Sequence, residues 1–373
     1  MILKDICMVD WGNTELTKSS YVENGRFLAV SAAGCDGKID HYEHESDVSV
    51  LSAIGAQCGK MFFPNTKFTA IKNTITLKPK ENVLGKYIFY LFTSINLPKR
   101  GTGQPFISKG DIEKFVIPQI PPLPIQQKIV AKLDKIFAEI DKATAVVEIN
   151  TRDIEVFFQS YLEKIYNNKY FAKKKISEIA KIKGGKRIPK GFNLKTEKTP
   201  YVYLRVKSFT ENGEIDNSEL RYVDAEVKNL IKNYIINSED LYISIAGTIG
   251  RTGIVSKQLS GSLLTENACR LVFEKNINNK FVYYFTKSPS FKSQVIEQTR
   301  TTAQPKLALN RLGDIELIIP NLKEQLRIVE SFDRISFFLT SIKNKYFSKI
   351  TELRKLKQSI LKQAFNGELV KAA

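Results

Sequence analysis

Residues 125–166 read IQQKIVAKLDKIFAEIDKATAVVEINTRDIEVFFQSYLEKIY, and residues 322–365 read LKEQLRIVESFDRISFFLTSIKNKYFSKITELRKLKQSILKQAF. Neither stretch contains Pro or Gly, so each is predicted to form one long helix, about 63 Å in length at ~1.5 Å per residue. Pro124 suits the first position of the first helix. Asn321, followed by Glu324, resembles the capping box that begins a helix.

Both stretches carry an apolar seven-residue repeat, and nine of the eleven a and d positions are apolar in each. The exceptions are Asn150 and Lys164 in the first helix and Lys349 and Gln363 in the second, which fall at the same places at an offset of 199 residues. A seam of this length needs a partner helix, and the obvious partner is the other copy. Asn150 and Lys349 are predicted to lie near the middle of an antiparallel pair and to fix its register; the alternative is that the polar positions mark solvated ends of loosely packed helices.

The segments that precede the helices are also duplicated, and they mix short β-branched stretches with Gly- and Asn-containing turns. The matched segments are Leu3–Ile6 with Ile176–Ile179, Phe27–Ser31 with Tyr203–Lys207, Asp36–Ile39 with Asn212–Ile215, Ser52–Lys60 with Ser244–Arg251, Lys86–Phe92 with Lys280–Thr286, Arg100 to Pro105 with Arg300 to Pro305, and Leu123–Val130 with Leu322–Val329. The predicted fold class is therefore α+β: two similar mixed α/β domains separated by two long helices that form an antiparallel coiled coil, with pseudo-two-fold symmetry.

The formal charge of +18 is large for 373 residues and favours a polyanionic partner, although a lysine-rich composition with a solvated surface would also produce it. Residues 1–173 hold 22 basic and 19 acidic residues, a net charge of +3, and residues 174–373 hold 35 and 20, a net charge of +15. Four scattered cysteines fit a reducing compartment, and neither a signal peptide nor an apolar run of roughly 18 residues is present. A cytoplasmic location away from membranes is expected.

The segments that enter the helices resemble those of one known family. FVIPQIPPLPIQQKIVAKLD (115–134), IIPNLKEQLRIV (318–329) and LKQSILKQAFNGEL (356–369) are similar to the conserved regions of specificity subunits of type I restriction–modification systems. The second entry is shorter and lacks the Pro-Pro pair of the first. The resemblance covers essentially the whole chain, and the combination of segments is far more specific than any one of them.

The resemblance implies target-recognition domains over 1–123 and 171–321, with conserved spacer helices over 124–170 and 322–373. Each recognition domain would read one half of a bipartite, asymmetric site on double-stranded DNA. The helices would dock two modification methyltransferase subunits, and two ATP-dependent restriction subunits would complete the complex. The resemblance implies no cofactor in this chain: S-adenosylmethionine, ATP and Mg²⁺ are expected on the partner subunits.

Motifs that could support chemistry in this chain are weak. Gly55 to Met61 superficially resembles a phosphate-binding loop but has one residue too few, with Met in place of Ser/Thr. His41 and His44, with Cys35 and Cys58 nearby, lack the spacing of a zinc site. Neither an Asn/Asp-Pro-Pro-Tyr/Phe element nor a dinucleotide-binding glycine fingerprint occurs. No catalytic or metal-binding residue is predicted; a nuclease or methyltransferase with undetected catalytic residues and a non-specific coiled-coil scaffold are the alternatives.

Basic residues near glycine turns and strand ends are the predicted DNA contacts, because Arg can read guanine and Lys mostly contacts phosphate. A solvated surface role is an equal alternative for any single one of them. The predicted contacts are Lys60, Lys99, Arg100 and Lys109 in the first recognition domain, and Lys183, Lys186, Arg187, Lys190, Arg205, Lys207, Arg251 and Arg300 in the second.

Overall fold

The computed structural model describes residues 1–299 and 305–369, and its contacts divide them into two compact units. Unit 1 combines Met1–Glu148 with the segment that begins at Tyr346, and unit 2 is the continuous stretch Ile149–Lys345. Each unit contains one globular part, called here the first head and the second head, and one half of each long helix. Within the described ranges, no helix is both long enough and apolar enough to cross a membrane.

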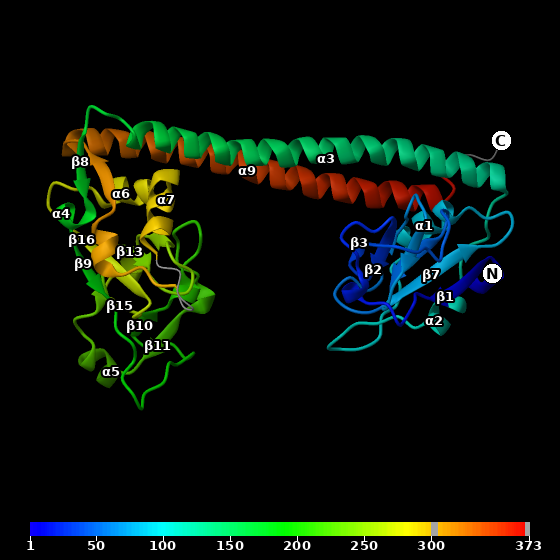
Figure 1. Ribbon diagram of the computed structural model, residues 1–373, viewed down its shortest axis with the longest axis horizontal. Coiled ribbons are helices and arrows are strands. Elements are labelled where there is room, and N and C mark those ends of the chain that lie inside the picture. Colours follow the sequence, from blue (N-terminus) through cyan, green and yellow to red (C-terminus); the bar gives the residue numbers. More distant parts are fainter. Residues whose placement is uncertain (300–304, 370–373) are drawn as a thin grey trace. The chain divides into compact units, whose positions relative to one another are not determined.

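The first head is built on two sheets, an antiparallel one in the order β1-β7-β4-β5 and a smaller one in the order β3-β2-β6 (Figure 1). In the smaller sheet β2 pairs with β6 in parallel. The strands are β1 Cys7–Trp11, β2 Phe27–Ser31, β3 Gly34–Ile39, β4 Ser49–Ser52, β5 Met61–Phe62, β6 Phe68–Ala70 and β7 Thr74–Pro79. The helices are α1 Gly85–Ser94 and α2 Lys109–Glu113.

The second head contains the sheets β14-β13-β16-β9 and β11-β10-β15-β12, with β10 and β15 parallel, and a two-stranded sheet β17-β8. The strands are β8 Ala172–Lys175, β9 Ala180–Gly184, β10 Tyr201–Leu204, β11 Arg221–Val223, β12 Ile235–Ile236, β13 Leu241–Ser244, β14 Thr252–Gly253, β15 Ser262–Leu264, β16 Ala268–Phe273 and β17 Glu316–Ile319. The helices are α4 Ile176–Ile179, α5 Ala225–Leu230, α6 Asn279–Lys287, α7 Pro289–Gln298 and α8 Leu309–Gly313.

The central strands are buried on both faces because each lies between two hydrophobic clusters. In β4, Val50 packs with Phe68 in one cluster, while Leu51 packs with Ile75 in another. In β13, Tyr242 stacks on Phe209 with ring centroids 4.1 Å apart, while its neighbours face the larger cluster of unit 2. Runs of consecutive apolar residues are typical of such doubly covered strands.

Equivalent backbone hydrogen bonds confirm that the heads are copies of one fold. The backbone nitrogens of Gly12 and Gly185 each donate to the first residue of the facing strand, Thr74 and Ala268, at 2.9 Å in both heads. This matches β1 with β9 and β7 with β16. A Cβ atom at Gly12 would lie 2.6 Å from the carbonyl oxygen of Ile71, and one at Gly185 would lie 2.0 Å from that of Thr265, so only glycine permits this close approach.

One part of the sequence-based alignment of the two halves is wrong. The backbone nitrogen of Ile71 donates to Val30 in the first head, and that of Thr265 donates to Leu204 in the second. Val30 therefore corresponds to Leu204, and β2 corresponds to β10 with a shift of two residues from the predicted match. The predicted match of residues 36–39 with 212–215 also fails, because the first stretch lies in β3 and the second forms a turn.

The two long helices form as single elements, α3 over Leu123–Tyr166 and α9 over Leu322–Phe365. Pro124 is the second residue of α3 rather than the first. The side chain of Asn321 caps α9 by accepting from the backbone nitrogen of Glu324 at 3.0 Å. In a complete capping box the Glu324 carboxylate would accept from the backbone nitrogen of Asn321. Here that carboxylate pairs with Arg327 instead.

The buried stripe of each helix follows eleven residues rather than the predicted seven. Ile129, Ile140 and Leu162 are buried in α3, and Ile328 and Leu361 are buried at matching places in α9. Eleven residues complete about three turns at 3.67 residues per turn, which is close to the 3.6 of an ordinary helix. The predicted seven-residue repeat leaves this stripe at several places in the second half of each helix, although Leu353 is buried and Tyr161 and Ile360 are partly buried as the repeat predicted.

Residues at the later heptad positions show this drift directly. Phe157 is 56% exposed and Leu356 is 47% exposed, although both were predicted to lie in the seam. Phe158 packs against the core of unit 2 in place of its neighbour. Lys349 is exposed, so its predicted place in the seam is wrong, whereas Asn150 is partly buried. That the two residues fix the register stays a prediction.

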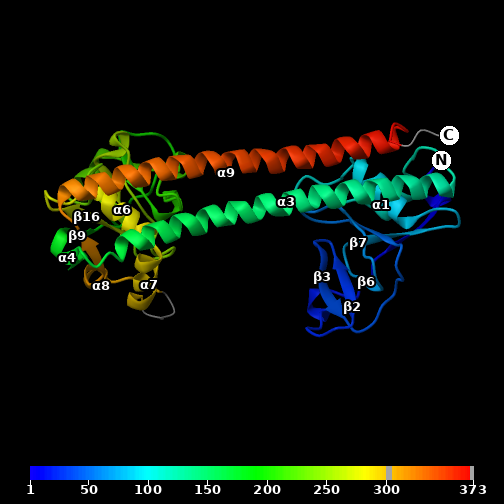
Figure 2. The same cartoon turned by 90° about the horizontal axis from the view of Figure 1, so that it is seen from above.

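The helices are antiparallel, as predicted, and lie side by side in both views (Figures 1 and 2). In unit 1, Lys357 of α9 pairs with Asp141 of α3. In unit 2, Lys343 pairs with Glu155 at 2.7 Å. The residue numbers of each pair sum to 498, so one register describes the pairing in both units.

Equivalent polar anchors attach each head to its helices. Gln126 is buried in α3; its amide accepts from the backbone nitrogen of Leu84 and donates to two carbonyl oxygens. Gln325 repeats this arrangement in α9 with Asn278 as donor. Asp134 accepts from Lys86 and Tyr90 of α1, and the same three residue types recur in unit 2, where Asp333 accepts from Lys280 and Tyr284 of α6.

Candidate nucleic-acid interface

Each head carries a glycine turn that ends in a cation. In the second head the backbone nitrogen of Ser244 donates to Arg251 at 2.9 Å, and that of Gly250 donates back to Ser244 at 2.9 Å. In the first head Ser52 and Lys60 form the same contact at 2.8 Å. Lys60 and Arg251 are therefore structurally equivalent, as the repeat predicted. The turn glycines have positive φ, +104° and +89° at Gly55 and Gly59, which fits a tight turn.

Arg251 lies in an open pocket of about 440 Å³ in the second head. Its Nη1 donates to the carbonyl oxygen of Phe209 at 2.8 Å, and its Nε is buried without a hydrogen-bond partner among the described residues. The pocket is lined by Val206, Lys207, Glu219, Ala246, Gly247, Thr248, Arg251 and Asn267. Two predicted contacts, Lys207 and Arg251, thus share one pocket.

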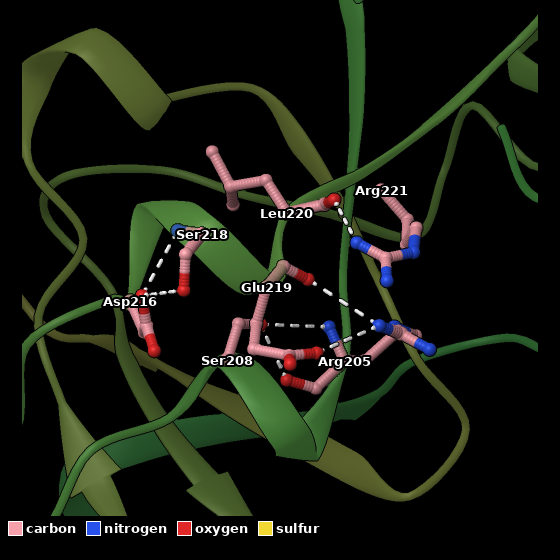
Figure 3. Close-up of polar contacts among 7 residues, drawn as sticks. All are labelled: Arg205, Ser208, Asp216, Ser218, Glu219, Leu220 and Arg221. Atoms are coloured by element: carbon pink, nitrogen blue, oxygen red, sulfur yellow. Dashed lines mark hydrogen bonds and ion pairs between the residues drawn. The ribbon is translucent and has the colours of Figure 1, made fainter. Parts of the chain in front are cut away.

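Arg205 lies beside this pocket and is held by an acidic residue. Its Nη2 contacts the Glu219 carboxylate at 3.2 Å and the Glu219 carbonyl oxygen at 3.4 Å (Figure 3). The Arg205 side chain is 24% exposed, and its Nε is also buried with no partner within the part of the chain that the structure describes. The turn that carries Glu219 is fixed by Asp216, whose side chain accepts from the backbone nitrogen of Ser218 at 2.9 Å.

The basic loop after β9 lies next to the same region of the second head. The Arg187 side chain is 79% exposed, and its Nε contacts Glu266, the neighbour of Asn267, at 2.7 Å. Burial opposes ionisation of Glu266, but hydrogen bonds from Arg187, from its own backbone and from Thr265 outweigh it and lower its pKa. Lys186 is exposed with its ammonium 5.8 Å from the Tyr234 ring centroid. Lys183 on β9 and Lys190 in the loop are exposed.

The predicted contacts of the first head form a looser group. Lys60 is exposed, and the side chain of Lys99 lies against Gly59. Arg100 forms an ion pair with Asp111 at the start of α2. Lys109 is half-buried between two carboxylates, with Asp10 at 2.7 Å and Glu113 at 3.7 Å, and the hydrogen bond to Asp10 is the main reason that its pKa is raised.

The residues that the sequence did not single out are the polar and acidic partners of these cations. Glu219 and Glu266 each hold a predicted arginine, and Asn267 lines the pocket with Arg251. Asn73 occupies the position of Asn267 in the first head, because its carbonyl oxygen accepts from Ala53 as that of Asn267 accepts from Ile245. The shared Asn between strands was the one available sequence signal. Arg300 falls outside the described residues.

The histidines and cysteines of the first head are not grouped. His44 packs on Phe68 with ring centroids 5.0 Å apart, and Cys58 is buried with its thiol donating to the Ala53 carbonyl oxygen at 3.2 Å. Among residues 1–299 and 305–369, no cluster of three or more His, Cys, Asp or Glu could hold a metal ion.

Comparisons of the sequence place it near one group of proteins. A family model described as a type I restriction modification DNA specificity domain matches residues 1–150 and 168–352. The specificity subunit of the type I restriction enzyme EcoBI of Escherichia coli is 24% identical over 322 residues, 79% of this chain and 68% of that protein. The MjaVIII specificity subunit of Methanocaldococcus jannaschii is 24% identical over 354 residues, 87% of this chain and 80% of that protein.

Solved structures share the whole fold. A chain from a study of complex assembly and conformational transition of the type I R-M system superimposes with a TM-score of 0.74 at 16% identity, covering 99% of this chain and 97% of that one. The HsdS subunit of Thermoanaerobacter tengcongensis gives a TM-score of 0.50 at 16% identity, with 99% and 96% covered. Two heads joined by long helices are therefore an architecture that this chain shares with known proteins.

Proposed function

Because this chain belongs to the family of type I restriction–modification DNA specificity domains, we propose that each of its two heads reads one half of a bipartite, asymmetric DNA site. A specificity subunit recognises DNA, and the chemistry belongs to other subunits. The observation that carries the proposal is the duplication itself: two heads with one fold present different residues at equivalent places. Asn13 corresponds to Lys186 because their backbone nitrogens make equivalent bonds to β6 and β15, and Ser31 corresponds to Arg205 because they follow Val30 and Leu204.

The paired helices support a spacer role. Both α3 and α9 are uninterrupted over 44 residues, about 66 Å at ~1.5 Å per residue. Half-sites read from one face of B-DNA must lie about one helical turn apart, ~34 Å, or a multiple of it. Continuous helices with one pairing register define a separation more sharply than a flexible linker would.

Exposed apolar residues on the helices support docking of partner subunits. Phe337, Phe338 and Phe347 of α9 are 80%, 63% and 73% exposed, and Val156 and Phe157 of α3 are 63% and 56% exposed. Large apolar side chains with this much exposure are candidates for contact with a partner. The proposed occupants are two modification methyltransferase subunits, with two ATP-dependent restriction subunits completing the complex; S-adenosylmethionine, ATP and Mg²⁺ would bind to those subunits.

A selection experiment tests the proposal. The full-length chain, co-expressed with the modification subunits of its own system, is used to select duplexes from a random-sequence library. Two short conserved blocks separated by a gap of fixed length are expected, and the same motif should contain the methylated adenines of the host genome. Equal retention of all duplexes would instead support a non-specific scaffold, and cofactor-dependent cleavage or methylation by the chain alone would support a self-sufficient enzyme.

A further inference from the structure

Buried polar atoms without partners gather at the glycine turns of the heads. Within the described residues, four buried side-chain nitrogen or oxygen atoms lack a hydrogen-bond partner: Ser52 Oγ, Gln159 Oε1, Arg205 Nε and Arg251 Nε. Ser52 begins the glycine turn of the first head, and Arg205 and Arg251 lie at that of the second. An unpaired buried polar group costs free energy, so the presence of such groups near the glycine turns of both heads indicates a surface completed by a ligand.

Two kinds of cation are present near these turns, and comparing the two heads distinguishes them: one kind occurs in both heads and the other in only one. The first kind, a cation directly after the turn, occurs in both heads as Lys60 and Arg251. The second kind occurs in the second head alone: Arg205 is held by Glu219, and its counterpart in the first head is Ser31, the residue after Val30. Glu219 lies on the 3-10 turn Asn217–Glu219, whereas the first head has strand β3 after β2.

We infer that Lys60 and Arg251 each anchor a DNA phosphate, whereas Arg205, positioned by Glu219, reads a base of the half-site that the second head recognises. This inference rests on the proposed DNA-recognition function. A task that both heads must perform on any sequence, such as holding the backbone, should fall to a group that both possess. A task that distinguishes the half-sites should fall to a group that only one head possesses.

The surroundings of each cation fit its assigned task. The Arg251 pocket contains Lys207, the turn residues Gly247 and Thr248, and also Glu219, whose carboxylate pairs with Arg205 at 3.2 Å. Because Arg205 neutralises that carboxylate, Lys207 and Arg251 leave the pocket positively charged, and clustered cations with turn backbone are typical of phosphate sites. Glu219 contacts the Arg205 guanidinium directly and neutralises its charge, so a phosphate gains less at Arg205 than at Arg251. It can instead hold the planar guanidinium so that the free N–H groups point at a base edge, as bidentate readout of guanine requires.

Conservative and charge-removing substitutions distinguish the two tasks. The full-length chain with its modification subunits is titrated with its selected duplex and with an unrelated duplex at several salt concentrations. K60Q and R251Q should weaken binding to both duplexes by the same factor and reduce the slope of log affinity against log salt by about 0.9, the value for one phosphate. R251K and K60R should restore the slope, because the slope depends on the number of phosphates neutralised and either Lys or Arg neutralises one.

Substitutions of the other pair should act on selectivity. R205K and R205Q should both relax the selected sequence at one position of one half-site, because Lys lacks the fork that reads guanine. E219Q should relax the same position while raising affinity for unrelated DNA, because it frees Arg205 and removes a negative charge. Loss of the fold alone would lower affinity for all DNA.

Three results would overturn the inference: R251Q changing the selected sequence at an unchanged salt slope, R205K preserving the full sequence, or E219Q lowering affinity for unrelated duplexes. A wild-type chain that selects no sequence would instead refute the proposed function. The two failures are therefore distinguishable.

Discussion

Arg187 and Lys109 show what the sequence can and cannot reveal about single residues. Both were predicted as exposed cations near DNA, and the structure pairs Arg187 with Glu266 and Lys109 with Asp10. These partners lie 79 and 99 residues away in the chain. A charge can be read from the sequence, but its partner depends on the packing of distant strands, so the carboxylates that hold the predicted cations could not be anticipated.

Gln126 and Gln325 are predicted to be essential to stability. Replacing either with Leu leaves one partly buried backbone N–H group and two carbonyl oxygens without their partner. We expect each substitution to lower the free energy of unfolding by about 2–3 kcal/mol, measured by urea denaturation. Q127L is the matched control, because Gln127 is exposed on the next position of α3. Equal effects of Q126L and Q127L would refute this role.

Lys287 should give the second head a measurable pH dependence. Burial is the main cause that lowers its pKa to about 8, from 10.5, and the charge of Lys292 adds to it. Between pH 8 and 10.5 the unfolded chain therefore holds more protons than the folded one at this site, so stability should rise with pH across that window and stay lowest below pH 8.

The comparison is with K287M, which has no titrating group at this position. From pH 7.5 to 9.5 the wild-type chain should gain on the order of 1 kcal/mol relative to K287M, measured by urea denaturation at each pH. K287M also removes the hydrogen bonds that the Lys287 ammonium donates to the carbonyl oxygens of Glu211 and Thr252, so the test compares how the stability of each protein changes with pH and not their absolute stabilities. A constant difference between the two proteins would disprove the shift.

At the level of elements, helix positions were predicted better than helix faces. The absence of Pro and Gly fixed α3 and α9 to within a few residues, because local propensity decides where a helix can continue. Which face of a helix is buried depends on the elements that pack against it. The seven-residue pattern suits a supercoiled pair, whereas these helices also pack on the heads, and the straighter eleven-residue stripe is the one that is buried.

Phe157 and Phe158 provide a direct test of the stripe. Phe158 packs against the core of unit 2 and stacks edge-on with Tyr284, whereas Phe157 is 56% exposed. F158A should lower the free energy of unfolding by about 2–3 kcal/mol, and F157A by less than about 0.5 kcal/mol. If F157A lowered the free energy of unfolding more than F158A does, measured in the isolated chain by thermal or urea unfolding, the result would support the seven-residue repeat instead.

Strand elements illustrate the same limit. The glycine turns and the strands beside them were correctly matched between the halves, because Ser and Gly recur at both. The β2 alignment failed by two residues, since Phe27 and Tyr203 are both aromatic and the pattern could not tell which backbone pairing each would adopt. Only the bonds from β6 and β15 define that register.

For the whole molecule, the duplication and the two-helix connection follow from the sequence, and the comparisons agree with both. The division into units does not follow from it. Each long helix contributes to both units, a distribution that depends on which contacts form along 44 residues rather than on any local signal.

A paired insertion tests the spacer proposal. Twenty-two residues, two eleven-residue repeats, are added to α3 after Glu148 and to α9 after Ile350, which keeps both stripes in phase. The helices lengthen by about 33 Å, close to the ~34 Å of one DNA turn. The selected half-sites should remain the same, with a gap longer by about ten base pairs.

An eleven-residue insertion is the control. It lengthens the helices by about half a DNA turn, which places the half-sites on opposite faces of the duplex and should abolish joint binding. An unchanged gap in the longer variant would rule out the spacer role.

The first head depends on residues that are synthesised more than 200 residues after it. Leu361 and Ala364 are buried in the same cluster as Leu3, and Lys132 donates to the carbonyl oxygen of Leu369. Unit 2 is a continuous stretch of chain, so its core can form during translation as soon as that stretch has been made. The core of unit 1 cannot be completed until the segment that begins at Tyr346 has also been synthesised. A stop codon shortly before Leu361 would thus damage the first head and spare the second.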